Sequence, residues 1–197
     1  MKFLHVGCGQ KNKTSTTTGF NSAEWEEVRL DIDEQVNPDI VGTMTNMEGV
    51  ESGSMDAVYS SHNIEHLYPH EVCVALKEFY RVLNEDGFVM ITCPDLQSVC
   101  KLVANDQLLD SAYVSPAGSI APIDILYGFR PSMAAGNLYM SHRTGFTQKT
   151  LIAAFRDSGF RAVVGARRES CFDLFCLASK KMLSRDEITS LAKLHFP

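Results

Sequence analysis

The sequence has no Cys-x-x-Cys pair, and none of its histidine, cysteine, aspartate and glutamate residues are spaced like the ligands of a metal site. We therefore expect no bound metal. Six cysteines without such a pair indicate reduced thiols in a cytosolic protein. Five of them lie in or beside apolar stretches and are expected to be packed in the interior, namely Cys8, Cys73, Cys93, Cys100 and Cys176.

A long run of basic residues is also missing, and the formal net charge is −6. Binding to a nucleic-acid backbone relies on clustered positive charge, so we expect no nucleic-acid partner. The short runs 11–13 and 167–168 are interpreted as solvated loop charges. No apolar stretch is long enough to span a membrane, and the run after Lys2 is too short for a signal peptide. These absences predict a cytoplasmic protein.

The chain is nevertheless well supplied with apolar residues. A hydrophobic content of 45% over 197 residues is sufficient for one domain with a sizeable core. The pattern leaves the oligomeric state open, and a homodimer is one of the alternatives.

A short apolar run, 3–6, leads directly into Gly7-Cys8-Gly9. This pattern predicts a buried strand that enters a tight turn. Glycine permits backbone conformations that a side chain forbids, and it allows the main chain to approach a ligand closely. Ligands of open α/β sheets bind at the carboxyl ends of the strands. We therefore expect a ligand at the end of this first strand.

The residues after this turn do not match the common nucleotide-binding loops. Asn12 stands where a dinucleotide fingerprint has its third glycine, and no Gly-Lys-Ser/Thr phosphate loop occurs. The second predicted strand, 27–31, nevertheless ends in Asp31. A carboxylate at this position accepts hydrogen bonds from ribose hydroxyls. The two features together predict a nucleoside site without the usual phosphate loop.

Further along the chain, apolar strands alternate with amphipathic helices, which is typical of a doubly wound, parallel α/β sheet. Gly87 is the expected stop signal of the helix that begins at Pro69. The stretches 160–167 and 171–179 predict a hairpin, which adds one antiparallel strand. Residues 110–146 are less regular but rich in apolar side chains, so we interpret them as an irregular insertion, or lid, that covers a ligand.

Seven stretches are arranged in an order that is more specific than any one of them: 4–9, 30–33, 55–66, 76–88, 91–94, 144–146 and 158–160. In this order they resemble the class I S-adenosylmethionine (SAM)-dependent methyltransferases, and more closely the bacterial branch with a small Rossmann-like domain. The resemblance covers most of residues 3–178. It implies a Rossmann-like, mostly parallel sheet of seven strands whose last strand is antiparallel, and it implies SAM as the cofactor.

The resemblance also implies roles for single residues. The turn at Gly7 and Gly9 corresponds to the part that flanks the methionine moiety of SAM, and Asp31 corresponds to the ligand of the ribose hydroxyls. The stretch 42–46 corresponds to the part that holds adenine. The residues after the fourth strand correspond to positions near the sulfonium. The implied cofactor-binding residues are His5, Gly7, Cys8, Gly9, Asp31, Thr43, Met44 and Ser61.

Two positions depart from the family pattern, which usually has an acid in place of His5 and often one in place of Thr43. The polar loop after Gly9 also departs from the usual glycine-rich entry to a helix, so we expect weaker cofactor binding, or a loop that becomes ordered on binding. The departures leave a non-catalytic SAM-binding or interaction protein open as an alternative. A nucleotide-dependent oxidoreductase of the same architecture is a third hypothesis, and the missing third glycine argues against it.

Methyl transfer from a sulfonium is an in-line displacement, so the protein mainly positions donor and acceptor. A general base assists when the acceptor is a hydroxyl, and histidine titrates in a suitable range. His62 and His142 are the candidate catalytic residues, with the insertion closing over the substrate to exclude water. By analogy with the family branch, the acceptor is a small molecule or a sugar or lipid precursor.

Overall fold

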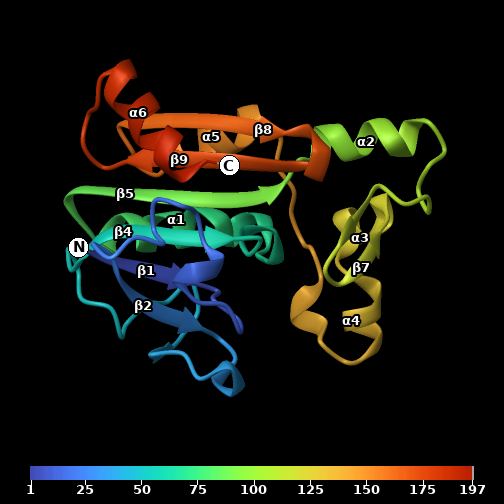
Figure 1. Ribbon diagram of the computed structural model, residues 1–197, viewed down its shortest axis with the longest axis horizontal. Helices are drawn as coiled ribbons and strands as arrows, with labels where there is room; N and C mark the ends of the chain where they lie inside the picture. Colours follow the sequence, from blue (N-terminus) through green and yellow to red (C-terminus); the bar gives the residue numbers. More distant parts are fainter. Residues whose placement is uncertain (197) are drawn as a thin grey trace.

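The apolar runs form a seven-stranded sheet with the strand order β3-β2-β1-β4-β5-β9-β8 in the computed structural model, which describes residues 1–196 (Figure 1). The first five strands in this order pair in parallel. β9 runs antiparallel to both of its neighbours. The predicted α/β sheet with one C-terminal antiparallel strand is therefore confirmed. The strands of this sheet are β1 (Lys2–Val6), β2 (Glu26–Asp31), β3 (Ile40–Val41), β4 (Met55–Ser61), β5 (Leu83–Pro94), β8 (Ala162–Arg168) and β9 (Asp173–Ser179).

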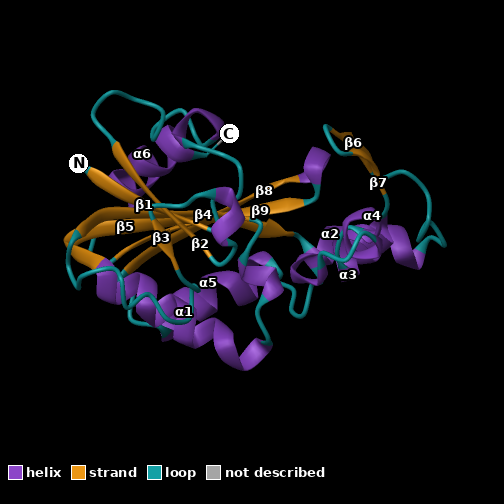
Figure 2. Ribbon diagram, turned by 90° about the horizontal axis from the view of Figure 1, so that it is seen from below, coloured by secondary structure: helices purple, strands orange, loops and turns teal. Residues whose placement is uncertain are grey.

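Two amphipathic helices, α1 (Pro69–Val82) and α5 (Gln148–Asp157), cover one face of the sheet (Figure 2). Leu76 and Phe79 of α1 are fully buried in the core cluster beneath them. The α5 helix begins after Thr147, whose hydroxyl oxygen accepts the backbone N–H of Thr150 as a helix N-cap. This face thus has the helix-on-sheet packing of a doubly wound fold.

A polar loop and the C-terminal helix α6 (Arg185–His195) cover the opposite face (Figure 2). Phe20 and Trp25 of the loop pack against Phe3 of β1, with ring centroids 4.6 and 6.0 Å from it. A capping box at Ser184 starts α6. Leu194 near the end of this helix is exposed, and the neighbouring His195 points inward instead.

The buried His195 is expected to make the stability of this face depend on pH. Burial lowers its pKa from 6.5 to about 4, and its ring centroid lies 4.3 Å from that of Phe20. Because the folded state favours the neutral ring, stability is highest above the unfolded pKa and falls as the pH decreases from 6.5 toward 4. The loss at pH 4.5 is about 2 to 3 kcal/mol.

Urea unfolding of the wild type and of His195→Phe at pH 7.5 and pH 4.5 measures this effect. Phenylalanine fills the aromatic site but does not titrate, so the variant should lose less stability on acidification than the wild type. An equal loss in both proteins would contradict the assignment.

The insertion is more regular than the sequence predicts. Its apolar residues form a small core of their own, in which Ile120 and Ile125 pack with Val99 of α2. Figure 1 shows this lobe beyond the carboxyl ends of β4 and β5. Apart from the helix α2 (Leu96–Ala104), the elements of the lobe are too short for periodicity to predict them, and contacts between them provide their stability. They are β6 (Tyr113–Ser115), β7 (Gly118–Ile120), α3 (Pro122–Tyr127) and α4 (Arg130–Ala134).

Two smaller expectations were wrong. β5 begins at Leu83 rather than after Gly87, because Leu83 already pairs with Met55 of β4. Cys73 and Cys100 are exposed, since helical periodicity places them on the outer side of α1 and α2, although all six cysteines are free as predicted. Within residues 1–196, no helix combines the length and hydrophobicity that crossing a membrane requires. Five 3-10 turns complete the chain: η1 (Lys13–Ser15), η2 (Glu34–Val36), η3 (Ile64–His66), η4 (Leu138–Met140) and η5 (Glu169–Cys171).

Candidate active site

The turn after β1 has two glycines in left-handed conformation, with different surroundings. Gly7 (φ +66°) packs against the side chain of Asn63, and a Cβ at Gly7 would lie 2.3 Å from Asn63 Oδ1. The amide of Asn63 in turn lies 3.2 Å from the carbonyl oxygen of Val6. Gly9 (φ +53°) has open space where its Cβ would be. Only the backbone at Gly9 is therefore free for close approach by a ligand.

Asp31 ends β2 beside this open backbone. Its Oδ2 accepts the N–H of Gly9 at 2.7 Å, and its Oδ1 accepts the N–H of Asp33 at 3.0 Å. A carboxylate has about four acceptor positions, so each oxygen retains capacity for one more donor. Asp31 thus fixes the turn and still has acceptor positions for a diol.

The loop after Gly9 is held by a charged side chain that the sequence analysis did not single out. Arg29 donates from its guanidinium to four carbonyl oxygens, those of Gly9 at 2.6 Å, Lys11 at 3.1 Å, Val36 at 3.3 Å and Asn37 at 2.9 Å. Because side chains alternate along a strand, Arg29 and Asp31 project from the same face of β2. The period-two spacing of charges in this strand was the signal that could have identified Arg29.

His5 is buried and turned toward that same face. Its Nδ1 lies 2.6 Å from Glu27 Oε1, while Glu27 Oε2 accepts the backbone N–H of Lys13. Burial lowers the pKa of His5 against the opposing effect of Glu27. The His5 ring and the Glu27 carboxylate thus connect β1 and β2 to the loop at Lys13. His5, at 2% exposure, acts on the loop through Glu27.

The remaining residues of the predicted cofactor set are Cys8, Thr43, Met44 and Ser61, and their side chains have different environments. Cys8 is buried, and burial raises the pKa of its thiol to about 11. The hydroxyl of Thr43 accepts the N–H of Asn46, and Met44 packs against the core. Ser61 exchanges a hydrogen bond with Thr92 at 2.8 Å. Their side chains therefore already have partners in the protein, which leaves the backbone as their available contact.

A cavity of about 140 Å³ lies past the end of β4, between the β4–α1 connection and the insertion. Apolar side chains form most of its wall, and Glu65, His66 and His142 lie close together in it. Both candidate catalytic histidines line it, although they are far apart in the sequence. The lining residues include His62, Glu65, His66, His142, Asp124, Tyr113, Ile120, Phe129, Met140 and Phe172.

His62 stands at the entrance of this cavity in a left-handed conformation (φ 56°) that is uncommon for histidine. Its Nδ1 lies 3.5 Å from Glu65 Oε1, and its Nε2 lies 3.9 Å from Asp173 Oδ2. Burial disfavours the charged ring, but these carboxylates outweigh it and raise the pKa of His62 to about 9. Because 44% of the side chain is exposed, solvent weakens the attraction without changing its direction.

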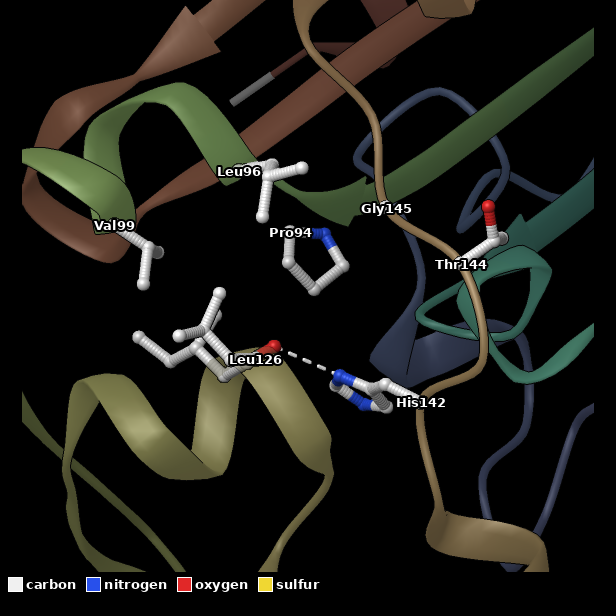
Figure 3. Close-up of a pocket in the computed structure, with 8 residues that line it drawn as sticks. Pro94, Leu96, Val99, Leu126, His142, Thr144 and Gly145 are labelled. Carbon is white, nitrogen blue, oxygen red and sulfur yellow. Dashed lines mark hydrogen bonds between the residues drawn. The ribbon is translucent and has the colours of Figure 1, made fainter. Parts of the chain in front are cut away.

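His142 comes from the insertion and is fixed from both sides. Its Nδ1 lies 2.8 Å from the carbonyl oxygen of Ile125, as the dashed line in Figure 3 marks. Its backbone N–H donates to Tyr127. Burial lowers the pKa of His142, so the ring is held neutral with Nδ1 as donor. Figure 3 also shows Pro94 and Leu126 beside the ring in a smaller adjoining hollow.

Glu65 and His66 also line the cavity, and sequence analysis did not include them among the site residues. Their side chains face His142. The signal available in the sequence was the pattern His62-x-x-Glu65-His66, because it places one acid and two histidines within five consecutive residues. Periodicity indicated only the start of a helix there, and the participation of His142 depends on tertiary structure.

Comparisons with known proteins fit this geometry. A family model described as a methyltransferase domain matches residues 4–91, from β1 into β5. A SAM-dependent methyltransferase from Archaeoglobus fulgidus shares the fold with a TM-score of 0.57 and 16% identity, over 91% of this chain and 86% of that one. Another from Methanosarcina mazei has a TM-score of 0.59 and 14% identity, over 92% of this chain and 93% of that one.

A third structure contains ligands. The 1,6-didemethyltoxoflavin-N1-methyltransferase of Burkholderia thailandensis, with bound 1,6-didemethyltoxoflavin and S-adenosylhomocysteine, has a TM-score of 0.58 and 14% identity. The likeness extends over 91% of this chain and 71% of that one. No curated protein sequence matches the chain significantly.

Proposed function

We propose that the chain is a class I SAM-dependent methyltransferase that methylates a small-molecule acceptor bound in the cavity beyond β4. The fold and the family model that matches residues 4–91 support this proposal. SAM is the cofactor. The observation that carries the proposal is the position of the 140 Å³ cavity. It adjoins the carboxyl end of β4, next to the strand that carries the glycine turn.

The end of β1 and β2 suits the nucleoside part of SAM. The open backbone at Gly9 provides room for close approach, and the spare acceptor positions of Asp31 suit the two ribose hydroxyls. The backbones of 42–46 and of Ser61 are proposed to line the adenine and methionine ends. His5 is proposed to support cofactor binding indirectly, by holding Glu27 and through it the loop at Lys13. When bound, SAM supplies an activated methyl group on its sulfonium.

The protein's part of the reaction is then positioning. His62 follows β4 and lines the cavity, and its imidazole is proposed to contact both the sulfonium side and the acceptor. His142 reaches the acceptor from the insertion. The apolar wall excludes water and orients the acceptor, which lowers the entropic cost of reaching the in-line geometry for methyl transfer. The surrounding lobe is proposed to serve as the lid over the acceptor.

A substitution that narrows the cavity is expected to block methyl transfer and to leave cofactor binding unchanged. In Met140→Trp the larger side chain fills the space that the acceptor needs, so turnover should fall about 10-fold or more. Affinity for S-adenosylhomocysteine should stay within about twofold of wild type, because Met140 lines only the acceptor cavity. Leu138→Trp is the matched control, since Leu138 lies on the same 3-10 turn and is exposed.

The measurement is formation of S-adenosylhomocysteine with a panel of small hydroxyl-, amine- and carboxyl-containing compounds, sugar and lipid precursors included. Cofactor binding without turnover on any of them would favour a non-catalytic SAM-binding protein. Equal turnover by both tryptophan variants and wild type would remove the cavity as the acceptor site.

A further inference from the structure

Glu65 is a buried carboxylate whose Oε1 lies 3.5 Å from Nδ1 of His62 without forming a hydrogen bond to it. Only 1% of the residue is exposed, and neither carboxylate oxygen has a hydrogen-bond partner within the described chain. Its backbone carbonyl, in contrast, accepts from both Arg143 and Thr144. Buried charges normally have a partner or bind a metal ion. The side chain of Glu65 is directed into the cavity, where nearby histidines provide the other polar groups.

Two of these histidines are oriented in the same way. The Nδ1 of His66 lies 3.1 Å from the carbonyl oxygen of Ser141, and the Nδ1 of His142 lies 2.8 Å from that of Ile125. A carbonyl oxygen can only accept, so Nδ1 carries the proton in both rings. In a neutral ring this leaves the Nε2 lone pair free. Metal-binding histidines are typically fixed by such a second hydrogen bond.

We propose that Glu65, His66 and His142 bind a divalent transition-metal ion, such as Zn²⁺, at the wall of the acceptor cavity. One donor atom from each residue lies within 4.8 Å of the other two. Two imidazole nitrogens and one carboxylate oxygen are a suitable donor set for Zn²⁺ and for neighbouring first-row metals. The site replaces our sequence-based expectation of no metal, which considered only residues close together along the chain.

The backbone holds the three ligands in register. Arg143 and Thr144 donate their N–H groups to the carbonyl oxygen of Glu65 at 2.8 and 3.2 Å. This bond pattern ties the insertion to the 3-10 turn η3, on which Glu65 and His66 are adjacent. Only small side-chain movements are then needed to bring the donor atoms into metal-ligand distance. The ligands are thus positioned by main-chain structure, as stable metal sites require.

Three protein ligands leave at least one coordination position free, which is typical of a catalytic rather than a structural metal site. Because all three residues line the cavity, an acceptor with an oxygen or nitrogen donor would be able to reach the free position. The binding of the ion itself does not depend on the proposed methyl transfer. A protein that binds the metal but shows no turnover would therefore leave this inference intact.

Calorimetric titration of the chelator-treated protein with Zn²⁺ tests the site. We expect one equivalent to bind in wild type, and about 100-fold weaker binding in Glu65→Gln and in His142→Ala, since each removes one of three ligands. His70→Ala is the matched control, because His70 is an exposed histidine outside the cluster and its loss should not change the affinity. Titration with Mg²⁺ should give much weaker binding, since imidazole is a poor ligand for that ion.

Binding of S-adenosylhomocysteine shows whether each variant is folded. If a variant fails this control, wild-type protein still decides the question: Zn²⁺ should protect His66 and His142, but not His70, from acylation by diethyl pyrocarbonate. Saturable binding with this pattern supports the site. No stoichiometric Zn²⁺ binding, or binding that the variants and the protection pattern leave unaffected, overturns it.

Discussion

Asp31→Ala is expected to weaken binding of SAM by about 100-fold or more. Hydrogen bonds to a charged group contribute about 1.5 to 3 kcal/mol each, and the proposed ribose contact includes two of them. The variant also removes the acceptor for the N–H of Gly9 at 2.7 Å, which shapes the turn that the cofactor approaches. Both effects reduce affinity in the same direction.

Calorimetric titration with SAM and with S-adenosylhomocysteine measures this loss. Asp33→Ala is the matched control, because Asp33 is an exposed acid two residues away that caps the 3-10 turn η2. Its affinity should remain within about threefold of wild type. If Asp31→Ala binds SAM as tightly as wild type, the nucleoside site does not lie at the end of β2, and the assignment of the cofactor site fails with it.

Gly7→Ala is expected to destabilise the protein by about 2 to 4 kcal/mol. An alanine at φ +66° is strained, and its Cβ would lie 2.3 Å from Asn63 Oδ1. The Asn63 side chain must then leave its position beside the carbonyl oxygens of Val6, Gly7 and Ser61. The change therefore loosens the ends of β1 and β4 together.

Gly9→Ala provides the comparison within the same turn. Its φ is also positive, but the space around its Cβ is open. The expected loss of stability is only about 1 kcal/mol from backbone strain. Cofactor affinity should nevertheless fall about 10-fold or more, because the new methyl group occupies the space that the ligand needs.

Urea unfolding and cofactor titration of both variants separate the two roles. The interpretation predicts that Gly7→Ala has the larger effect on stability. It also predicts that Gly9→Ala loses more cofactor affinity than its small loss of stability would explain. Equal losses of stability would show that Asn63 does not depend on a glycine at position 7.

The order of strands and helices was accessible from the sequence, because local patterns specify it. The run that ends at Gly7, the strand that ends at Asp31 and the cap at Thr147 each depend on neighbouring residues. Alternation of such elements restricts the sheet to a few topologies. The insertion was different, since its short helices and hairpin are stable only through contacts such as that of Ile125 with Val99.

The candidate site likewise has one part that the sequence predicted and one part that only the structure revealed. The sequence by itself determined the fold class and predicted the proposed cofactor end, because Gly9 and Asp31 lie at the carboxyl ends of strands that must meet in a parallel sheet. Only the tertiary structure revealed the cavity that we propose for the acceptor, in which Glu65 and His142 come together from distant segments. It also decided that Arg29 fixes the loop after Gly9. Long-range contacts of this kind have no local pattern, because they follow from how the insertion folds back over the sheet.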